Sequence, residues 1–318
     1  MGSKNKEQFK YDDISVLSRN ETEQYKLKIK YGSALNLVIG DVRDYEVTHK
    51  SMDGVDAVIH AAAIKHIDVA EKNPFEAIKT NIQGTQNVLR AAMSQNVRRL
   101  INISTDKTCN PNSTYGATKL IGERLTTAIA IDGDLDYSTC RFGNILGSNG
   151  SVFQLWKNLA RDKRPIPITS LEMTRFFITI EKSARFVLDQ MSKPGKGSIF
   201  VPLLNSFSMR ELASHIAPES KLQVIGLRPG EKIHEDLVNA SELEHATFTE
   251  EVIEIFPSEL KSVKSKFSKA PSLHQIKDLI SDEWFCSNQI NELDSEINRF
   301  YNIYSMSNQD MREYLNCL

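Results

Sequence analysis

Five side chains that can donate or accept protons stand within one stretch of sixteen residues. Thr105, Asp106 and Lys107 are consecutive. Tyr115 and Lys119 follow four residues apart, so on a helix they would share one face. A lysine ammonium one turn from a tyrosine favours the phenolate and lowers the pKa of the phenol. Such a phenolate can take the proton of a sugar hydroxyl while a nicotinamide takes the hydride.

A buried strand is expected to position this stretch. The apolar run at residues 100–103 predicts a strand, and ligands of open α/β sheets bind at the carboxyl ends of the strands. Apolar residues at helical spacing follow strands in several places, as between residues 74 and 93. Strands that alternate with helices predict an α/β fold with a doubly wound parallel sheet. The main strands are expected at residues 14–17, 35–39, 55–59, 100–103 and 137–142.

The pattern along the chain changes twice and predicts three regions. Residues 14–146 carry the alternation of strands and helices and are expected to form a dinucleotide-binding domain. Residues 147–256 carry shorter strands and predict a smaller α/β substrate lobe that partly interleaves with the sheet domain. Residues 257–318 predict a linker rich in Lys and Ser, followed by a polar helical extension.

The composition is that of an ordinary soluble protein, with 40% hydrophobic and 25% charged residues in 318. A net charge of −2 implies no bulk attraction to nucleic acid or anionic lipid. No apolar run approaches the ~20 residues of a membrane span, and the first residues contain no secretory signal. The four cysteines show no metal-ligand spacing, so we expect reduced thiols, no metal site and a cytoplasmic location.

The longer motif around the first five side chains resembles a known family. Thr105, Tyr115 and Lys119 look like the Ser/Thr–Tyr–Lys triad of extended short-chain dehydrogenase/reductases, which have a Rossmann fold. The full string STDK(x)₂NP(x)₃YGATK resembles the inverting UDP-N-acetylglucosamine 4,6-dehydratases, the group that starts pseudaminic acid and several capsular sugars. The match runs from about residue 14 to about residue 256. Further segments that agree in order lie at residues 40–44, 60–63, 65–66, 141–144, 173–176 and 227–232.

This resemblance implies a role for each of the five side chains. Thr105 would hydrogen-bond the 4-oxygen of the sugar. Tyr115 would be the base of the hydride-transfer step, and Lys119 its helper, which also reaches the nicotinamide ribose. Removal of water across C5 and C6 of a 4-keto sugar then needs an acid, Asp106, and a base, Lys107. Both must be neutral to act, although their mutual attraction keeps both charged.

The expected cofactor is NADP rather than NAD. Ser18 and Arg19 follow a predicted strand where NAD-preferring enzymes usually carry an acidic residue, and an arginine can grip a 2′-phosphate. By resemblance Asp41 and Val42 contact adenine. For Asn81 a structural and a functional reading are equally open. Further cofactor-binding residues implied by the resemblance are Ala61, Ala62, Ala63 and Lys65, beside Tyr115 and Lys119.

The expected substrate is a UDP-sugar, whose two phosphates suit two arginines from separated segments. By resemblance these are Arg175 and Arg228, and Glu231 would accept from ribose or sugar hydroxyls. Asn144 and Lys107 complete the substrate-binding set. Each arginine has an alternative reading as a partner of a surface carboxylate.

The start of the predicted sheet departs from the family pattern. A dinucleotide-binding sheet begins with an apolar strand, a GxxGxxG turn and a helix, and residues 1–13 hold one glycine and no apolar run. The missing strand is the central one, so its absence would leave two neighbouring strands without a partner. We therefore expect a truncated gene model, a split gene or a degraded copy, with an atypical replacement of the strand as the alternative.

Two other functions stay open on this sequence. A UDP-sugar 4-epimerase or reductase would use the same triad, but it needs neither an acid at C6 nor a base at C5, which argues against it. A catalytically inactive copy that serves as a binding or assembly module would explain the missing glycine loop. The family is usually oligomeric, so a homo-oligomer is expected.

Overall fold

The computed structural model describes residues 13–258 apart from 147, 149–151 and 250, so the predicted linker and helical extension lie almost wholly outside the described residues. A six-stranded sheet forms the centre, in the order β12-β13-β9-β5-β4-β3. The four strands from β9 to β3 are parallel, and β13 and β12 continue the sheet in antiparallel pairing. The strands are β3 (Ala57–His60), β4 (Arg99–Thr105), β5 (Asp136–Phe142), β9 (Ile199–Pro202), β12 (Ala246–Phe248) and β13 (Val252–Ile255).

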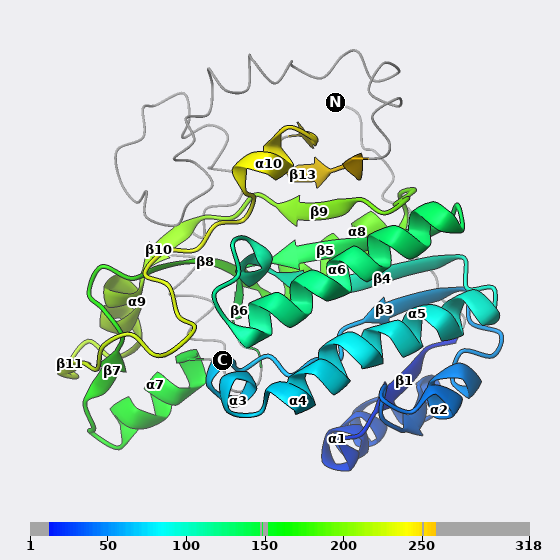
Figure 1. Cartoon of the computed structure of the whole chain (residues 1–318). Helices are drawn as coiled ribbons and strands as arrows, with labels where there is room; N and C mark the ends of the chain where they lie inside the picture. Colours follow the sequence, from blue (N-terminus) through cyan, green and yellow to red (C-terminus); the bar gives the residue numbers. More distant parts are fainter. Residues whose placement is uncertain (1–12, 147, 149–151, 250, 259–318) are drawn as a thin grey trace, which may run out of the picture.

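Helices cover both faces of this sheet, as expected for a doubly wound fold (Figure 1). Successive residues of β4 point to opposite faces: Leu100 packs into a core with α5 and α6, and Ile101 packs into a core with α8. Both side chains are buried, which is why the strand reads as a continuous apolar run. The helices are α5 (Gly84–Ser94), α6 (Thr114–Asp132) and α8 (Ile180–Met191).

The sheet is interrupted where the sequence predicts a missing central strand. In the described part of the chain β1 (Ser15–Ser18) pairs only with β2 (Asn36–Ile39), and β3 pairs only with β4. Helix α2 (Tyr45–Lys50) packs on α5 and ties the two sheets together. Leu17 of β1 and Val58 of β3 pack against the same core. The strands on either side of the interruption therefore share one hydrophobic layer on the helix side.

The helix predicted over residues 74–93 is not continuous. It consists of α4 (Pro74–Ala77), a π-helical segment (Ile78–Gln83) and α5. The π-helical turns contain Asn81, whose side chain bonds to the backbone of Ile64 across the site. Apolar periodicity does not register a widened turn of this kind, which is frequent at functional sites.

The smaller lobe is built from short strands and two amphipathic helices around a core that includes Trp156 and Phe177. A three-stranded sheet has the order β10-β8-β6, and β11 pairs with β7. Its parallel and antiparallel pairs agree with the irregular pattern predicted after residue 147. The elements are β6 (Asn144–Leu146), α7 (Val152–Arg161), β7 (Ile166–Ile168), β8 (Thr174–Thr179), β10 (Ser206–Ser208), α9 (Met209–Ile216) and β11 (Leu222–Val224).

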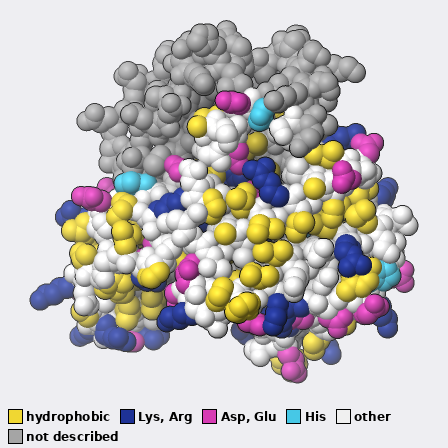
Figure 2. Space-filling view, viewed as in Figure 1, with side chains coloured by type: hydrophobic (Ala, Val, Ile, Leu, Met, Phe, Trp, Pro, Cys, Tyr) yellow, Lys and Arg dark blue, Asp and Glu magenta, His cyan; other side chains and the backbone are white. Residues whose placement is uncertain are grey.

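Figure 2 shows basic and acidic side chains interspersed over the described part of the face in view, without a large area of one sign. This distribution gives that face no electrostatic footprint for a polyanion. None of the described helices is both long enough and apolar enough to cross a bilayer. The remaining helices are α1 (Glu21–Tyr31), α3 (Ile67–Lys72) and α10 (Ala240–Leu243).

Candidate active site

The carboxyl end of β4 leads directly into a 3-10 turn, η3 (Asp106–Thr108). Thr105 Oγ1 donates a hydrogen bond to Asp106 Oδ1 at 3.0 Å, and Lys107 Nζ donates to the same oxygen at 2.8 Å. The Asp106 side chain has no exposed surface, and that of Lys107 keeps 15% of its surface exposed. Asp106 Oδ2 is buried and has no hydrogen-bond partner among the described residues. The pair thus consists of a buried carboxyl group and a largely buried amine, and one oxygen of the carboxyl group makes no hydrogen bond to the described residues.

The first turn of α6 lies directly against η3. Ser113 caps the helix by accepting from the Gly116 backbone N–H at 3.1 Å. A Cβ at Gly116 would lie 2.3 Å from the carbonyl oxygen of Lys107, so only glycine allows this approach. The YGATK segment therefore needs its glycine to bring Tyr115 and Lys119 close to η3.

Tyr115 and Lys119 differ from the sequence-based expectation in their electrostatics. Burial raises the pKa of Tyr115, and the cation that opposes this shift is Lys107, with a hydrogen bond from Thr105 acting in the same direction. Burial lowers the pKa of Lys119 to about 8, against the attraction of Glu123. The prediction that Lys119 lowers the pKa of Tyr115 is therefore wrong for this structure. Helical spacing places both on one face, but it does not reveal that Lys119 is buried beside Glu123.

Lys107 contacts a second carboxylate that the sequence analysis missed. Glu235 Oε1 lies 3.6 Å from Lys107 Nζ, and Asn144 Oδ1 accepts from the same nitrogen at 3.4 Å. Burial lowers the pKa of Lys107, but Asp106 and Glu235 outweigh this effect and the pKa is raised. The sequence did contain a signal for Glu235. It is the last residue of the charged segment 227–235, which also contains the predicted substrate residues Arg228 and Glu231.

The two predicted phosphate-binding arginines lie in different surroundings, one buried and one exposed. Arg175 is buried in β8, and its guanidinium donates to the backbone carbonyls of Thr174, Ile233 and Lys232. Arg228 is half exposed and forms an ion pair with Glu231. Arg175 thus clamps the loop that carries Glu231 toward the site, and direct contact of either arginine with a phosphate stays a prediction.

The predicted adenosine-side residues gather at the ends of β1 and β2. Arg19 Nη1 lies 3.4 Å from Asp41 Oδ2, and Arg43 donates to the same oxygen at 2.7 Å. Burial raises the pKa of Asp41, but the hydrogen bonds and charge of Arg43 outweigh it, so the pKa is lowered. Ser18 Oγ accepts from the backbone N–H of Asn20. Two guanidinium groups therefore stand beside the predicted position of the cofactor ribose.

The other predicted cofactor residues divide into open and packed positions. Ala61 and Ala62 are exposed and Ala63 half-buried after β3, and Lys65 Nζ is 3.3 Å from Ser148 Oγ. Asn81 is buried and bonds to Ile64 and Thr118, which favours its structural reading. Val42 packs in the core beneath α5. Contact of each of these with a cofactor stays a prediction.

These positions suit the two ends of a nicotinamide dinucleotide, with Arg19 and Arg43 at the predicted ribose end and Tyr115 and Lys119 at the predicted nicotinamide end. The described residues contain no glycine-rich turn at a helix N-terminus for the pyrophosphate, and residues 1–12, to which most of the expectation from the sequence applies, lie outside them. They also contain no group of three or more His, Cys, Asp or Glu side chains that could hold a metal ion.

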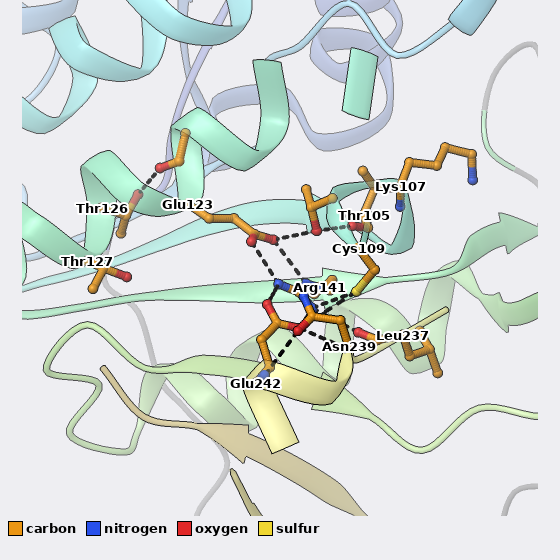
Figure 3. Close-up of polar contacts among 12 residues, drawn as sticks. Thr105, Lys107, Cys109, Glu123, Thr126, Thr127, Arg141, Leu237, Asn239 and Glu242 are labelled. Atoms are coloured by element: carbon orange, nitrogen blue, oxygen red, sulfur yellow. Dashed lines mark hydrogen bonds and ion pairs between the residues drawn. The ribbon is translucent and has the colours of Figure 1, made fainter. Parts of the chain in front are cut away.

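A buried ion network lies directly beneath η3 (Figure 3). Arg141 of β5 is fully buried, and its Nη2 pairs with Glu123 Oε2 at 2.8 Å and with Glu242 Oε1 at 2.7 Å. Thr108 of η3 donates to Glu123 Oε1 at 3.1 Å, and Arg141 Nη1 lies 3.0 Å from Cys109 Sγ. The network joins β5, α6, the end of η3 and α10. Burial lowers the pKa of Arg141, but the carboxylates raise it well above the usual value.

Comparisons with known proteins show which family this chain resembles. A family model described as a polysaccharide biosynthesis protein matches residues 3–257. A UDP-N-acetylglucosamine 4,6-dehydratase (inverting) of Campylobacter jejuni is 42% identical over 269 residues, which cover 82% of this chain and 80% of the relative. A UDP-glucose 4-epimerase of Rickettsia felis is 36% identical over 242 residues, which cover 74% and 71%.

Solved structures confirm the predicted fold class. Pen from Bacillus thuringiensis has a TM-score of 0.75 and 32% identity, and the match covers 84% of this chain and 89% of that one. The dTDP-glucose 4,6-dehydratase DesIV from Streptomyces venezuelae, solved with NAD and TYD bound, has a TM-score of 0.65 and 22% identity, with 70% and 77% covered. The second likeness shows the shared α/β fold alone.

Proposed function

The chain belongs to the polysaccharide biosynthesis protein family, and from this membership and its site we propose that it dehydrates UDP-N-acetylglucosamine with the aid of NADP. The product is a UDP-4-keto-6-deoxy-N-acetyl-hexose with inverted C5, a precursor for capsular sugars or pseudaminic acid. The observation that carries the proposal is the buried Asp106–Lys107 pair, whose 2.8 Å hydrogen bond lies at the end of β4. We also propose that the enzyme works as a homo-oligomer.

The side chains of this chain perform the proton transfers. Tyr115 takes the proton of the sugar 4-hydroxyl, with Thr105 at the 4-oxygen and Lys119 beside the nicotinamide ribose. Because burial raises the pKa of Tyr115 in the ligand-free chain, its phenol must release a proton to solvent before this step. A bound NADP would be held by Arg19 at its 2′-phosphate and by Tyr115 and Lys119 at its nicotinamide side, and it would supply the hydride acceptor for C4 and the hydride donor for C6. Lys107 removes the C5 proton, and Asp106 protonates the departing 6-oxygen.

The protonation states of this pair follow from their contact. The raised pKa of Lys107 means that the amine starts as an ammonium, because Asp106 and Glu235 outweigh the effect of burial. A transfer of one proton from Lys107 Nζ to Asp106 Oδ1 makes the amine a base and the carboxyl an acid in one step. Asp106 Oδ2 has no hydrogen-bond partner among the described residues, which supports the proposal that this carboxyl group contacts a substrate oxygen.

The test is incubation of the chain with UDP-N-acetylglucosamine and NADP, followed by NMR and mass spectrometry of the sugar nucleotide. Dehydration gives a product lighter by one water with a 4-keto or hydrated 4-keto carbon. The Rickettsia relatives make a 4-epimerase the second candidate, and that activity would give an isomer of unchanged mass. Unchanged substrate would favour the third possibility, an inactive binding module.

The preference for NADP predicts a selective effect of Arg19→Ala. We expect the dissociation constant of NADPH to rise about 10- to 100-fold, because hydrogen bonds to charged groups contribute about 1.5–3 kcal/mol. NADH lacks the 2′-phosphate, so its binding should change less than about threefold by the same reasoning. Calorimetric titration of both cofactors measures the difference. An equal loss for both, or no binding of NADPH to the unaltered chain, would contradict the proposal.

A further inference from the structure

Glu235 is a buried carboxylate that lies beside Lys107. It takes no part in the proton transfers proposed above. Its residue is 1% exposed, and its Oε1 lies 3.6 Å from Lys107 Nζ. Asp106 Oδ1 contacts the same nitrogen at 2.8 Å, so two carboxylates share one amine. Carboxylates are almost never fully buried unless they are paired, which makes the pairing of Glu235 with Lys107 a specific feature of the site.

The loop that carries Glu235 is tied to the site at several points. Arg175 donates from Nη1 to the carbonyl of Ile233 at 2.9 Å and from Nη2 to the carbonyl of Lys232 at 2.8 Å. Lys232 Nζ donates to the carbonyl of Cys109, just after η3, at 2.7 Å and lies 3.9 Å from Glu235 Oε2. These bonds fix the carboxylate in the smaller lobe relative to the catalytic turn.

The proton balance of the proposed reaction leaves one task for such a group. When Asp106 holds the proton that it will give to the 6-oxygen, it is neutral and no longer a counter-ion. Lys107 then takes the C5 proton, its N–H bond forms as the C5–H bond breaks, and an ammonium appears in a buried site. Only after the C6–O bond breaks and water departs is Asp106 a carboxylate again.

We propose that Glu235 is a positioning residue that holds Lys107 in place and stabilises the ammonium formed during C5 deprotonation. This role rests on the proposed dehydration. The charged groups that act on Glu235 are Lys107, Asp106, Arg175 and Lys232. Burial raises the pKa of Glu235, and Lys107, Arg175 and Lys232 oppose this shift. The proposed role requires Glu235 to stay a carboxylate while Asp106 changes its charge, so the two carboxylates are not interchangeable.

The first test needs no activity. Lys107 in the ligand-free chain is acetylated with acetic anhydride over a series of pH values, and its labelling is quantified by mass spectrometry. In Glu235→Gln the midpoint should fall by about one pH unit, a tenfold change in proton affinity, because the ammonium loses a neighbouring carboxylate. Glu235→Asp should recover part of the shift. Glu254 of β13 is also a partly buried carboxylate, so Glu254→Gln is the matched control. It should leave the midpoint of Lys107 labelling unchanged.

The second test is the rate of dehydration. Glu235→Gln should lower kcat about 10- to 100-fold with little change in KM, and Glu235→Asp should restore part of it. An unchanged midpoint for Lys107 in Glu235→Gln would overturn the proposal. A shifted midpoint with unchanged kcat would overturn its catalytic part. If the unaltered chain forms no product, the proposed function fails, while the labelling experiment still decides whether Glu235 controls Lys107. Should the Gln variant not fold, the Asp variant is used for both tests.

Discussion

The Lys107→Ala variant is expected to lose dehydration of UDP-N-acetylglucosamine, with kcat lower by about 10²–10⁴-fold, the usual contribution of a positioned acid or base. No second amine hydrogen-bonds Asp106 among the described residues, so none can replace Lys107 at this carboxyl. Quantification of the keto sugar by NMR measures the loss. The substrate should still bind, because the phosphates are expected to contact other residues.

A matched control separates this effect from a general loss of charge. Lys79 also pairs with a carboxylate, Glu76 at 2.9 Å, but its side chain is 53% exposed and lies on the helical surface. Lys79→Ala should leave the rate of dehydration within about twofold of the unaltered chain, since exposed pairs contribute little. Circular dichroism should show both variants folded. Normal turnover in Lys107→Ala would show that Lys107 is not the base, and it would contradict the proposed roles of Lys107 as base and Asp106 as acid.

The sequence predicted the elements around the site because their signals are local. Strand β4 contains a continuous apolar run, so a strand was predicted at residues 100–103, inside the observed Arg99–Thr105. The spacing of Tyr115 and Lys119 placed both on one helix, which is α6. The 3-10 turn η3 between β4 and α6 was not predicted. The separation of β1 and β2 from β3 among the described residues was also predicted, because residues 1–13 hold no apolar run for the central strand of the family pattern. The π-helical segment was missed, because its apolar residues keep nearly helical spacing.

The electrostatics of the site could not be predicted in the same way. Glu235 and Glu242 reach the candidate site from the part of the chain after β11, and Glu242 lies 101 residues along the chain from Arg141. Such contacts depend on how the two lobes pack, which no local pattern records. The environment of Tyr115 has the same cause, since burial and Lys107 govern its pKa more than its neighbour on the helix.

Arg141→Ala is expected to lower the free energy of unfolding by about 3–5 kcal/mol, the usual cost of removing one partner from a buried ion pair. The substitution leaves the carboxylates of Glu123 and Glu242 buried side by side without the guanidinium between them. It also removes the donor to the carbonyl of Leu237. Urea denaturation followed by circular dichroism measures the change.

An exposed pair provides the matched control. Arg98 contacts Asp56 at the start of β4, and the two side chains are 76% and 73% exposed. Arg98→Ala should cost no more than about 1 kcal/mol, because water screens the pair and solvates the carboxylate that remains. A loss of similar size in both variants would mean that the buried network contributes no more than a surface contact.

The geometry of the network predicts that Arg141→Lys is also harmful. A lysine keeps the charge but offers a single ammonium, whereas the guanidinium donates to Glu123 from Nε and Nη2 and to Glu242 from Nη1 and Nη2. The planar fork therefore holds α6 and α10 at a fixed angle to β5. Because Thr108 donates to the same Glu123, a slackened fork would also shift η3 and the Asp106–Lys107 pair. We expect Arg141→Lys to recover only part of the stability and to lower the rate of dehydration, which would show that the buried charges fix the catalytic turn as well as the fold.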